Sequence, residues 1–333
     1  MRKIIVTGGT GFLGSYILYY LINNNEKPIA IKRKNSSFET IKNIFLRQGD
    51  KNLKLFKKIK WKEIDILDYY NVGEAIKGAD IIFHCAALVS FDSKEKENLL
   101  NTNYHATKNL INFSLIHNIS KFCYVSSVAT LSKEINQTIY DESSWFSWTD
   151  KKSNYAISKY LAEMEVWRGF AEGLNGFIIN PSLIIGPGDK NGLFSNLIKK
   201  VGNKTLFFPK GSSGFVDVRD VAQIMIKLEK LNVINERYII NAHNKSFKDV
   251  MSFFSKKLKN KKPSVPINRR IIKFYLMISN LYSFIFRKKP LFTSEMLDFI
   301  DGNLNYSNQK IANKLNYNFI KFEKSLDDSI EKK

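Results

Sequence analysis

A short apolar strand sequence that runs directly into three evenly spaced glycines constrains the fold more than any other stretch of the chain. Ile4–Val6 is typical of a buried parallel strand, and Phe12–Ile22 has the apolar periodicity of a helix. A glycine turn between a strand and a helix N-terminus gathers free backbone N–H groups around one point, which favours a bound pyrophosphate. We expect Gly8 to form the turn, Gly11 to admit the phosphates and Gly14 to let helix and strand pack closely. The spacing is G-x-x-G-x-x-G rather than G-x-G-x-x-G, and an ordinary strand-to-helix turn is the alternative.

Strand and helix patterns then alternate along the first half of the chain. Strand patterns occur at residues 28–31, 59–64, 80–87, 122–125 and 176–180. Helical patterns occur at residues 38–48, 71–77, 98–117 and 153–172. The alternation predicts the α/β class, with a Rossmann-type doubly wound parallel sheet and a smaller, mostly helical C-terminal substrate lobe. The predicted Rossmann domain spans 1–180 with 216–243 returning to it, and the predicted lobe comprises 181–215 and 244–333.

The composition is that of a globular protein with a strongly basic surface. Among 333 residues, 44% are hydrophobic and 13% aromatic, enough for a large core. The formal net charge is +21, and lysine is abundant throughout the sequence. We interpret this charge as a solvated lysine-rich surface, with attraction to anionic cofactors, acidic substrates or membranes as the alternative. No motif supports nucleic-acid binding, so nucleic acid is not an expected partner.

The cysteines and apolar runs address compartment and membrane contact. Cys85 and Cys123 lie in apolar strand patterns without metal-ligand spacing, which predicts small core residues, a reducing compartment and no metal site. The chain begins directly with a strand pattern, so we expect no signal peptide and a cytoplasmic location. The uncharged, strongly apolar run 274–286 is too short to span a bilayer. With its basic flanks (269–289), it fits the lining of an apolar pocket or a weak interfacial membrane contact.

A tyrosine and a lysine four residues apart form the second strong signal. In the helical pattern that contains them, Tyr155 and Lys159 share one face. The ordinary pKa of tyrosine, about 10, is too high for acid–base chemistry near neutrality, and a nearby ammonium lowers it. Ser127 follows a strand pattern and can donate a hydrogen bond to the same substrate oxygen. A surface pair is the alternative, but the position downstream of the glycine turn and the serine favours a catalytic site.

With these motifs in this order, the chain resembles the extended short-chain dehydrogenase/reductase family of the NAD-dependent epimerase/dehydratase superfamily. The resemblance spans essentially the full chain and rests on Thr7–Gly14, Asp65, His84–Ala87, Asn103 with Thr107, Ser127, Tyr155 with Lys159, Asn180–Ser182, Gly186–Gly188, Phe215–Ala222 and Leu315–Tyr317. It implies that Tyr155 is the acid/base at the substrate oxygen, that Lys159 lowers the tyrosine pKa and holds the nicotinamide ribose, and that Ser127 polarises the carbonyl. The cofactor contacts that it implies are Thr7, Gly8, Gly11, Phe12, Leu13, Gly14, Asp65, Ile66, Ala86, Ala87, Asn103, Tyr155, Lys159, Pro181 and Ser182.

The end of the second strand pattern indicates which nicotinamide cofactor to expect. An NAD-selective site usually places an acidic residue there, about 20 residues beyond the glycine turn. This chain has Arg33 and Lys34 at that point and no Asp or Glu before Glu39. Because a cationic fork suits a 2′-phosphate, we predict NADP, with Arg33 as the chief contact and Lys34 assisting. NAD remains the alternative if both are ordinary surface residues.

The substrate segments are similar to those of the dihydroflavonol-reductase and hydroxysteroid-dehydrogenase branches. Relatives that act on nucleotide sugars often carry Arg and Tyr-Gly-Pro where this chain has Gly214 and Ile185-Gly186-Pro187. We therefore predict hydride transfer to a ketone or aldehyde, or the reverse oxidation, on an apolar small molecule. One alternative is a nucleotide-sugar epimerase or dehydratase with tightly bound NAD; Val128-Ala129 in place of an Asp-Glu pair weakens the dehydratase. Another is a non-catalytic nucleotide-sensing protein. The resemblance also allows a homodimer through the helix that carries Tyr155.

Overall fold

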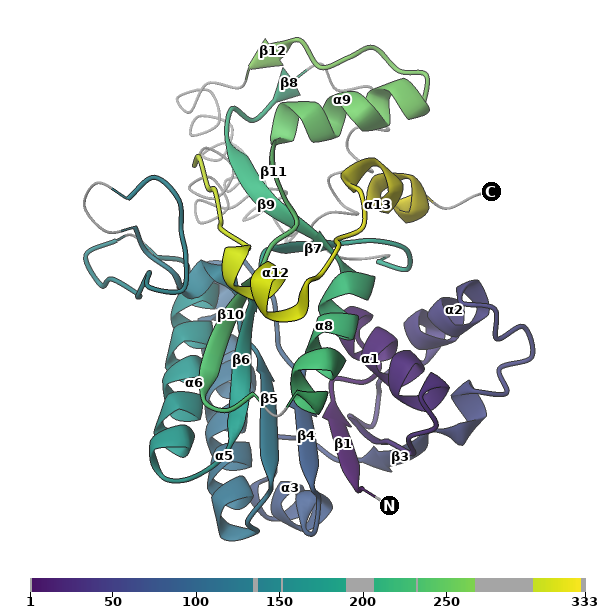
Figure 1. Ribbon diagram of the computed structural model, residues 1–333, viewed down its shortest axis with the longest axis vertical. Helices are drawn as coiled ribbons and strands as arrows, with labels where there is room; N and C mark the ends of the chain where they lie inside the picture. The colour runs from purple at the N-terminus through teal and green to yellow at the C-terminus, as the bar shows by residue number, and fades with distance from the viewer. Residues whose placement is uncertain are drawn as a thin grey trace.

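A seven-stranded parallel sheet forms the centre of the molecule (Figure 1). The computed structural model describes residues 2–133, 137–150, 152–189, 207–231, 233–266 and 302–330. The strand order is β10-β6-β5-β4-β1-β2-β3, and every neighbouring pair runs parallel. The strands are β1 (Ile4–Thr7), β2 (Ile29–Lys32), β3 (Lys60–Glu63), β4 (Ile81–His84), β5 (Lys121–Val125), β6 (Gly176–Pro181) and β10 (Glu236–Ile240). The order reverses between β1 and β4, which is the point where ligands bind in such sheets.

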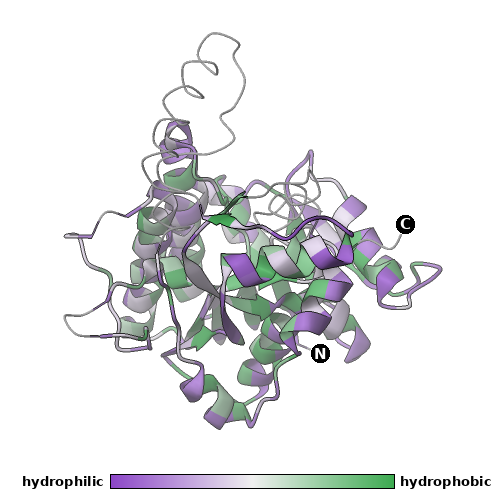
Figure 2. Ribbon diagram, turned by 90° about the horizontal axis from the view of Figure 1, so that it is seen from above, coloured by the Kyte–Doolittle hydropathy of each residue, from purple (hydrophilic) through white to green (hydrophobic). Residues whose placement is uncertain are grey.

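Helices cover both faces of this sheet. One apolar core joins the sheet to α1 (Phe12–Asn23), α2 (Glu39–Arg47) and α8 (Val218–Lys230). The opposite core joins it to α3 (Tyr69–Ile76), α5 (Ala106–Ile116) and α6 (Asn154–Ala171). Along β1, Ile4 and Val6 enter the first core and Ile5 the second, as the period of two in a strand requires. Apolar and polar residues alternate along the covering helices (Figure 2). The predicted doubly wound α/β fold is therefore confirmed.

Later segments of the chain build a second, smaller group of elements. A three-stranded sheet has the order β11-β9-β7, with β7 at Leu183–Ile185, β9 at Ser212–Asp217 and β11 at His243–Ser246. A two-stranded sheet pairs β8 (Phe207–Phe208) with β12 (Val265–Pro266). The helices α9 (Phe247–Lys257) and α13 (Phe322–Ser329) belong to this group, whereas α12 (Gln309–Leu315) packs against β10 and the first core of the central sheet. Phe215, Phe254 and Phe322 lie in its core. The division of the chain into two lobes at the boundaries given above stays a prediction.

The hydrophobic segment with basic flanks falls outside this description. We expected a pocket lining or a membrane contact from the apolar run 274–286 with its basic flanks (269–289). This segment lies outside the described residues. Across the residues that the structure does describe, we find no helix with the length and apolar character needed to cross a membrane.

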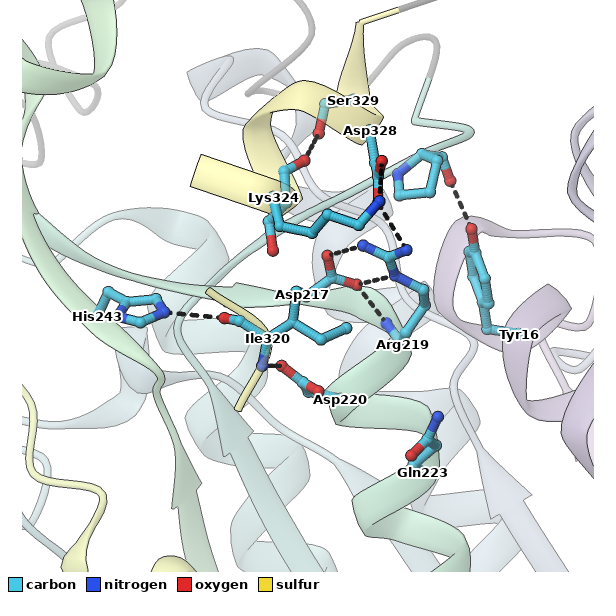
Figure 3. A network of polar contacts seen from close by, with 12 residues as sticks. Tyr16, Asp217, Arg219, Asp220, Gln223, His243, Ile320, Lys324, Asp328 and Ser329 are labelled. Atoms are coloured by element: carbon cyan, nitrogen blue, oxygen red, sulfur yellow. Dashed lines mark hydrogen bonds and ion pairs between the residues drawn. The ribbon is translucent and has the colours of Figure 1, made fainter. Parts of the chain in front are cut away.

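A polar network joins the end of the chain to the start of α8 (Figure 3). The Arg219 guanidinium donates to both carboxylate oxygens of Asp217, at 2.8 and 2.7 Å, and to Asp328 of α13 at 2.8 Å. Next to it, Asp220 accepts hydrogen bonds from the Tyr317 hydroxyl and the Ile320 backbone N–H, both at 3.0 Å. Burial raises the pKa of Asp220 to about 6, against the lowering effect of these two hydrogen bonds. The C-terminal segment is thus held by charged groups at the N-terminal end of α8.

Replacing Asp220 by Asn is expected to stabilise the protein above pH 6. The folded state holds the Asp220 proton more tightly than the unfolded chain, so the wild-type protein loses stability as the pH rises from about 4 to about 6. Asn keeps an acceptor for the Ile320 N–H, and the Tyr317 hydroxyl retains Gln223 as a second acceptor at 3.3 Å. The unfolding free energy of Asp220→Asn relative to wild type should rise by up to about 3 kcal/mol between pH 4 and pH 7.5.

Chemical denaturation at a series of pH values checks this expectation. Asp249→Asn, on the exposed first turn of α9, is the matched control for the loss of one carboxylate at the start of a helix. A pH-independent difference for Asp220→Asn would contradict the expectation.

Candidate active site

The glycine turn has the shape that a dinucleotide requires. Gly8 has a φ of +69°, and a Cβ there would lie 2.7 Å from the backbone nitrogen of Ala86. A Cβ on Gly14 would lie 2.3 Å from the carbonyl oxygen of Gly8, so only glycine permits this approach of helix to turn. No side chain caps the N-terminus of α1 and no acidic residue stands in its first turn. The N–H groups of Phe12 and Leu13 therefore remain at the helix N-terminus for an anion. These features fit a pyrophosphate.

A buried hydrogen-bond chain connects this turn to β4. The hydroxyl of Thr107 donates to the Asn103 carbonyl at 2.6 Å, so it accepts from His84 Nε2 at 2.9 Å. His84 Nδ1 then accepts from the Thr7 hydroxyl at 2.6 Å, and Thr7 accepts from the Ala86 N–H at 3.2 Å. Burial lowers the pKa of His84 to about 3, which agrees with a neutral ring. The side chain of Thr7, expected as a cofactor contact, is thus used to hold β1 and β4 together.

Asn103 has a similar internal role. The predicted helix at 98–117 consists of α4 (Lys96–Leu99), a π-helical turn (Leu100–His105) and α5. The π-turn directs the Asn103 amide to the backbone of Leu88, accepting from its N–H at 2.7 Å and donating to its carbonyl at 3.0 Å. The amide also donates to the Ser158 hydroxyl at 2.9 Å. Asn103 therefore ties the loop after β4 to α6, with both ends of its amide already occupied.

The three predicted catalytic residues meet at the carboxyl edge of the sheet. Ser127 follows β5, and its hydroxyl accepts from the Ala129 N–H at 3.2 Å. Tyr155 lies in the first turn of α6, where its partly buried ring faces Phe91 at a centroid distance of 6.2 Å. The buried Lys159 ammonium donates to the Tyr124 hydroxyl and to the Val125 carbonyl, each at 2.7 Å.

The electrostatics of this site differ from the expectation. Burial raises the pKa of Tyr155, and a hydrogen bond with Ser127 lowers it only in part. Burial also lowers the pKa of Lys159 to about 7, although Glu163 and Cys85 act to raise it. Lys159 is not among the causes that shift the Tyr155 pKa here, since its ammonium binds Tyr124 and, with this pKa, is only partly charged near neutrality. The lowering of the tyrosine pKa by Lys159 stays a prediction. Phe91 and Glu163 were not anticipated as parts of the site, although Glu163 lies one helical turn beyond Lys159.

A second group of predicted residues lines a pocket at the ends of β2 and β3. The pocket has a volume of about 750 Å³ and is lined by Arg33, Lys34, Asn35, Ser36, Glu63, Ile64, Asp65, Asp68 and Asn71. Arg33 and Lys34 are exposed, and no ion pair with a described residue engages the Arg33 guanidinium. Lys32, by contrast, pairs with Glu63 at 2.5 Å. The pocket contains the carboxylate of Asp65 as well as the cationic side chains of Arg33 and Lys34, so its lining carries both signs of charge.

The remaining predicted contacts lie nearby. Ile66 is buried, and Ala86 and Ala87 follow β4 directly. Pro181 ends β6, and the hydroxyl and N–H of Ser182 donate to the Ile240 carbonyl at 3.4 and 3.0 Å. Over the described part of the chain, no group of three His, Cys, Asp or Glu side chains is arranged to hold a metal ion.

Comparison with known proteins agrees with this geometry. Cinnamoyl-CoA reductase 1 of Petunia hybrida is 28% identical over 267 residues, covering 77% of this chain and 77% of that protein. The decarboxylating sterol-4-alpha-carboxylate 3-dehydrogenase of Dictyostelium discoideum is 23% identical over 347 residues, covering 98% and 100%. The crystal structure of the Bordetella bronchiseptica enzyme WbmH in complex with NAD+ covers 99% of this chain and 97% of that one, with a TM-score of 0.75 and 18% identity.

A family model extends the agreement over most of the chain. The model described as the NAD dependent epimerase/dehydratase family matches residues 4–241, from β1 through β10. This match confirms the resemblance drawn from the sequence motifs. The chain belongs to the NAD-dependent epimerase/dehydratase family.

Proposed function

We propose that the protein is an NADP-dependent oxidoreductase that reduces an apolar ketone or aldehyde, or oxidises the corresponding alcohol. The observation that carries the proposal is the convergence of Ser127, Tyr155 and Lys159 at the sheet edge that also bears the glycine turn. Two relatives support this reaction class, since one is named a reductase and the other a dehydrogenase.

The chain's own residues account for proton transfer and orientation. When bound, a nicotinamide dinucleotide supplies the hydride for the carbonyl carbon. Tyr155 donates its phenolic proton to the substrate oxygen; its raised pKa keeps the phenol protonated near neutrality, as a proton donor requires. The Ser127 hydroxyl donates a hydrogen bond to the same oxygen and polarises the carbonyl. In its charged form, Lys159 favours the phenolate that remains on Tyr155, which is the effect predicted from their spacing.

The surroundings of Tyr155 favour an apolar substrate. Phe91 lies on the loop that follows β4, and its ring lies near that of Tyr155. Val89 on the same loop is 60% exposed, so this loop presents an apolar side chain at the surface. An apolar substrate that covers these two side chains gains binding energy from the area removed from water.

The reaction is tested by following the oxidation of NADPH in the presence of aldehydes, ketones and nucleotide sugars. Net oxidation with apolar carbonyl compounds supports the proposal. Conversion of a nucleotide sugar without net oxidation would replace it with an epimerase or dehydratase, in which the hydride returns to the same molecule. Cofactor binding without any turnover would favour a nucleotide-sensing protein.

Arg33→Ala is expected to weaken NADPH binding about 10- to 100-fold and to leave NADH binding within about twofold. The exposed Arg33 guanidinium is available for a bidentate contact with a 2′-phosphate, which NADH lacks. Dissociation constants from fluorescence titration at one fixed ionic strength check this. Arg47→Ala, at the end of α2 and outside the pocket, is the matched control for loss of positive charge. Tighter binding of NADH than NADPH by the wild-type protein would overturn the NADP assignment.

A further inference from the structure

A buried carboxylate lies directly beneath the candidate active site. Glu163 of α6 is 1% exposed. Its Oε2 atom accepts from the Ser126 hydroxyl at 2.5 Å, from Asn180 Nδ2 at 2.9 Å and from the Thr130 hydroxyl at 3.1 Å. Its Oε1 atom pairs with Arg237 Nη1 at 3.3 Å. A buried carboxylate is tolerated because it is hydrogen-bonded in this way, and here its partners come from four different segments.

Two of these partners also hold the backbone of Ser127. Asn180 Nδ2 lies 3.2 Å from the Ser127 carbonyl oxygen, and the Thr130 hydroxyl lies 2.9 Å from the same atom. Asn180 Nδ2 has two hydrogens and donates to Glu163 as well as to the Ser127 carbonyl, whereas the single Thr130 proton serves one of these two acceptors at a time. A substitution at Glu163 is therefore expected to shift the backbone of Ser127.

Glu163 lies four residues beyond Lys159 on α6, and its charge acts on the ammonium through space, without an ion pair between them among the described contacts. Burial of the Lys159 ammonium favours its neutral form, and the charge of Glu163 opposes this. The other titratable groups around the ammonium are neutral at physiological pH. Burial raises the pKa of Cys85 to about 12 and that of Tyr124 well above its ordinary value, and it lowers the pKa of His84 to about 3. Among these described neighbours, Glu163 supplies the negative charge.

We propose that Glu163 is a positioning residue that holds the Ser127 end of β5 in place and keeps the ammonium charge on Lys159. The proposal rests on the function proposed above, in which Ser127 and Lys159 serve the reaction. Glu163 itself is buried behind both residues and acts through them.

The effect of Glu163 on the charge of Lys159 is tested by NMR. The protein is labelled with ¹³C at the lysine ε-carbons, whose chemical shifts report the protonation of Nζ. We expect one resonance to titrate near neutrality and to disappear in Lys159→Met. In Glu163→Gln its midpoint should fall by about one pH unit or more, because an opposite charge nearby favours the charged form. Glu165→Gln, which removes a carboxylate from the same helix beside Arg168, should leave the midpoint unchanged. An unchanged midpoint in folded Glu163→Gln would overturn the proposal.

Glu163→Gln leaves the Arg237 guanidinium buried without its carboxylate, so thermal unfolding is followed in parallel. If this variant does not fold, the same titration is recorded on the double variant Glu163→Gln/Arg237→Met, because the double variant has no unpaired guanidinium. Because the titration needs neither substrate nor cofactor, its outcome stands even if carbonyl reduction fails.

Glu163→Asp separates geometry from charge. It keeps the carboxylate but shortens the side chain by one methylene, so the contacts with Ser126 and Thr130 lengthen. The Lys159 midpoint should stay within about 0.3 units of wild type, while kcat for carbonyl reduction falls about tenfold and the KM for NADPH changes less than twofold. A Lys159 midpoint that falls as far as in Glu163→Gln would show a packing role alone and overturn the proposal.

Discussion

Replacing Tyr155 by Phe is expected to reduce kcat/KM for carbonyl reduction by about 100-fold or more while NADPH affinity changes by less than about threefold. A positioned general acid contributes roughly 10²–10⁴-fold to a reaction rate, and Phe removes the proton while keeping the ring. The ring contact with Phe91 is preserved, so the variant should fold normally. Steady-state kinetics and a fluorescence titration with NADPH measure the two effects separately.

Tyr160→Phe is the matched control for this experiment. Tyr160 lies on the same helix and stacks on Phe146 at a centroid distance of 4.1 Å. Loss of its hydroxyl should leave kcat/KM unchanged. Turnover that survives in Tyr155→Phe would mean that another group delivers the proton, and the assigned mechanism would be wrong.

The sheet could be predicted from sequence because its signal is local. Each apolar run in the first half of the chain became a strand of the central sheet, with ends displaced by one to a few residues. The interruption of the helix at 98–117 was not predictable in this way. It depends on the contact of Asn103 with the backbone of Leu88, and the pattern of apolar residues within the helix carries no information about that contact.

The candidate site was predictable as a set of residues but not as an electrostatic environment. The spacing of four places Tyr155 and Lys159 on one helix face, and the structure agrees. Their pKa values depend instead on burial beneath segments that are distant in sequence, which reverses the expected effect on Tyr155. The partners of Glu163 likewise come from β6, from β10 and from the residues that follow β5, so the spacing along α6 indicates only that a carboxylate is present.

Gly14→Ala is expected to weaken NADPH binding by on the order of 100-fold, because misplacement of binding groups by about 1 Å has effects of this size. The added Cβ would lie 2.3 Å from the Gly8 carbonyl oxygen and 2.8 Å from its carbonyl carbon. Both are backbone atoms, so the clash is relieved only by moving α1 away from the turn. That carbonyl also accepts the Gly11 N–H at 2.9 Å, so the whole anion site is distorted.

Gly73→Ala in α3 distinguishes this local effect from a general cost of adding a methyl group to a helix. The three atoms nearest to a Cβ there all belong to the ring of Phe113, the nearest at 2.6 Å, and the gain in helix propensity of about 0.5–1 kcal/mol offsets part of the cost of moving that ring. Gly73→Ala should therefore keep wild-type NADPH affinity, whereas Gly14→Ala should lose affinity and also about 1–3 kcal/mol of unfolding free energy. Fluorescence titration and chemical denaturation measure both quantities in each variant. Wild-type affinity in Gly14→Ala would mean that the close approach of α1 to the turn is not required for the cofactor, and the pyrophosphate would then have to be bound elsewhere on the sheet edge.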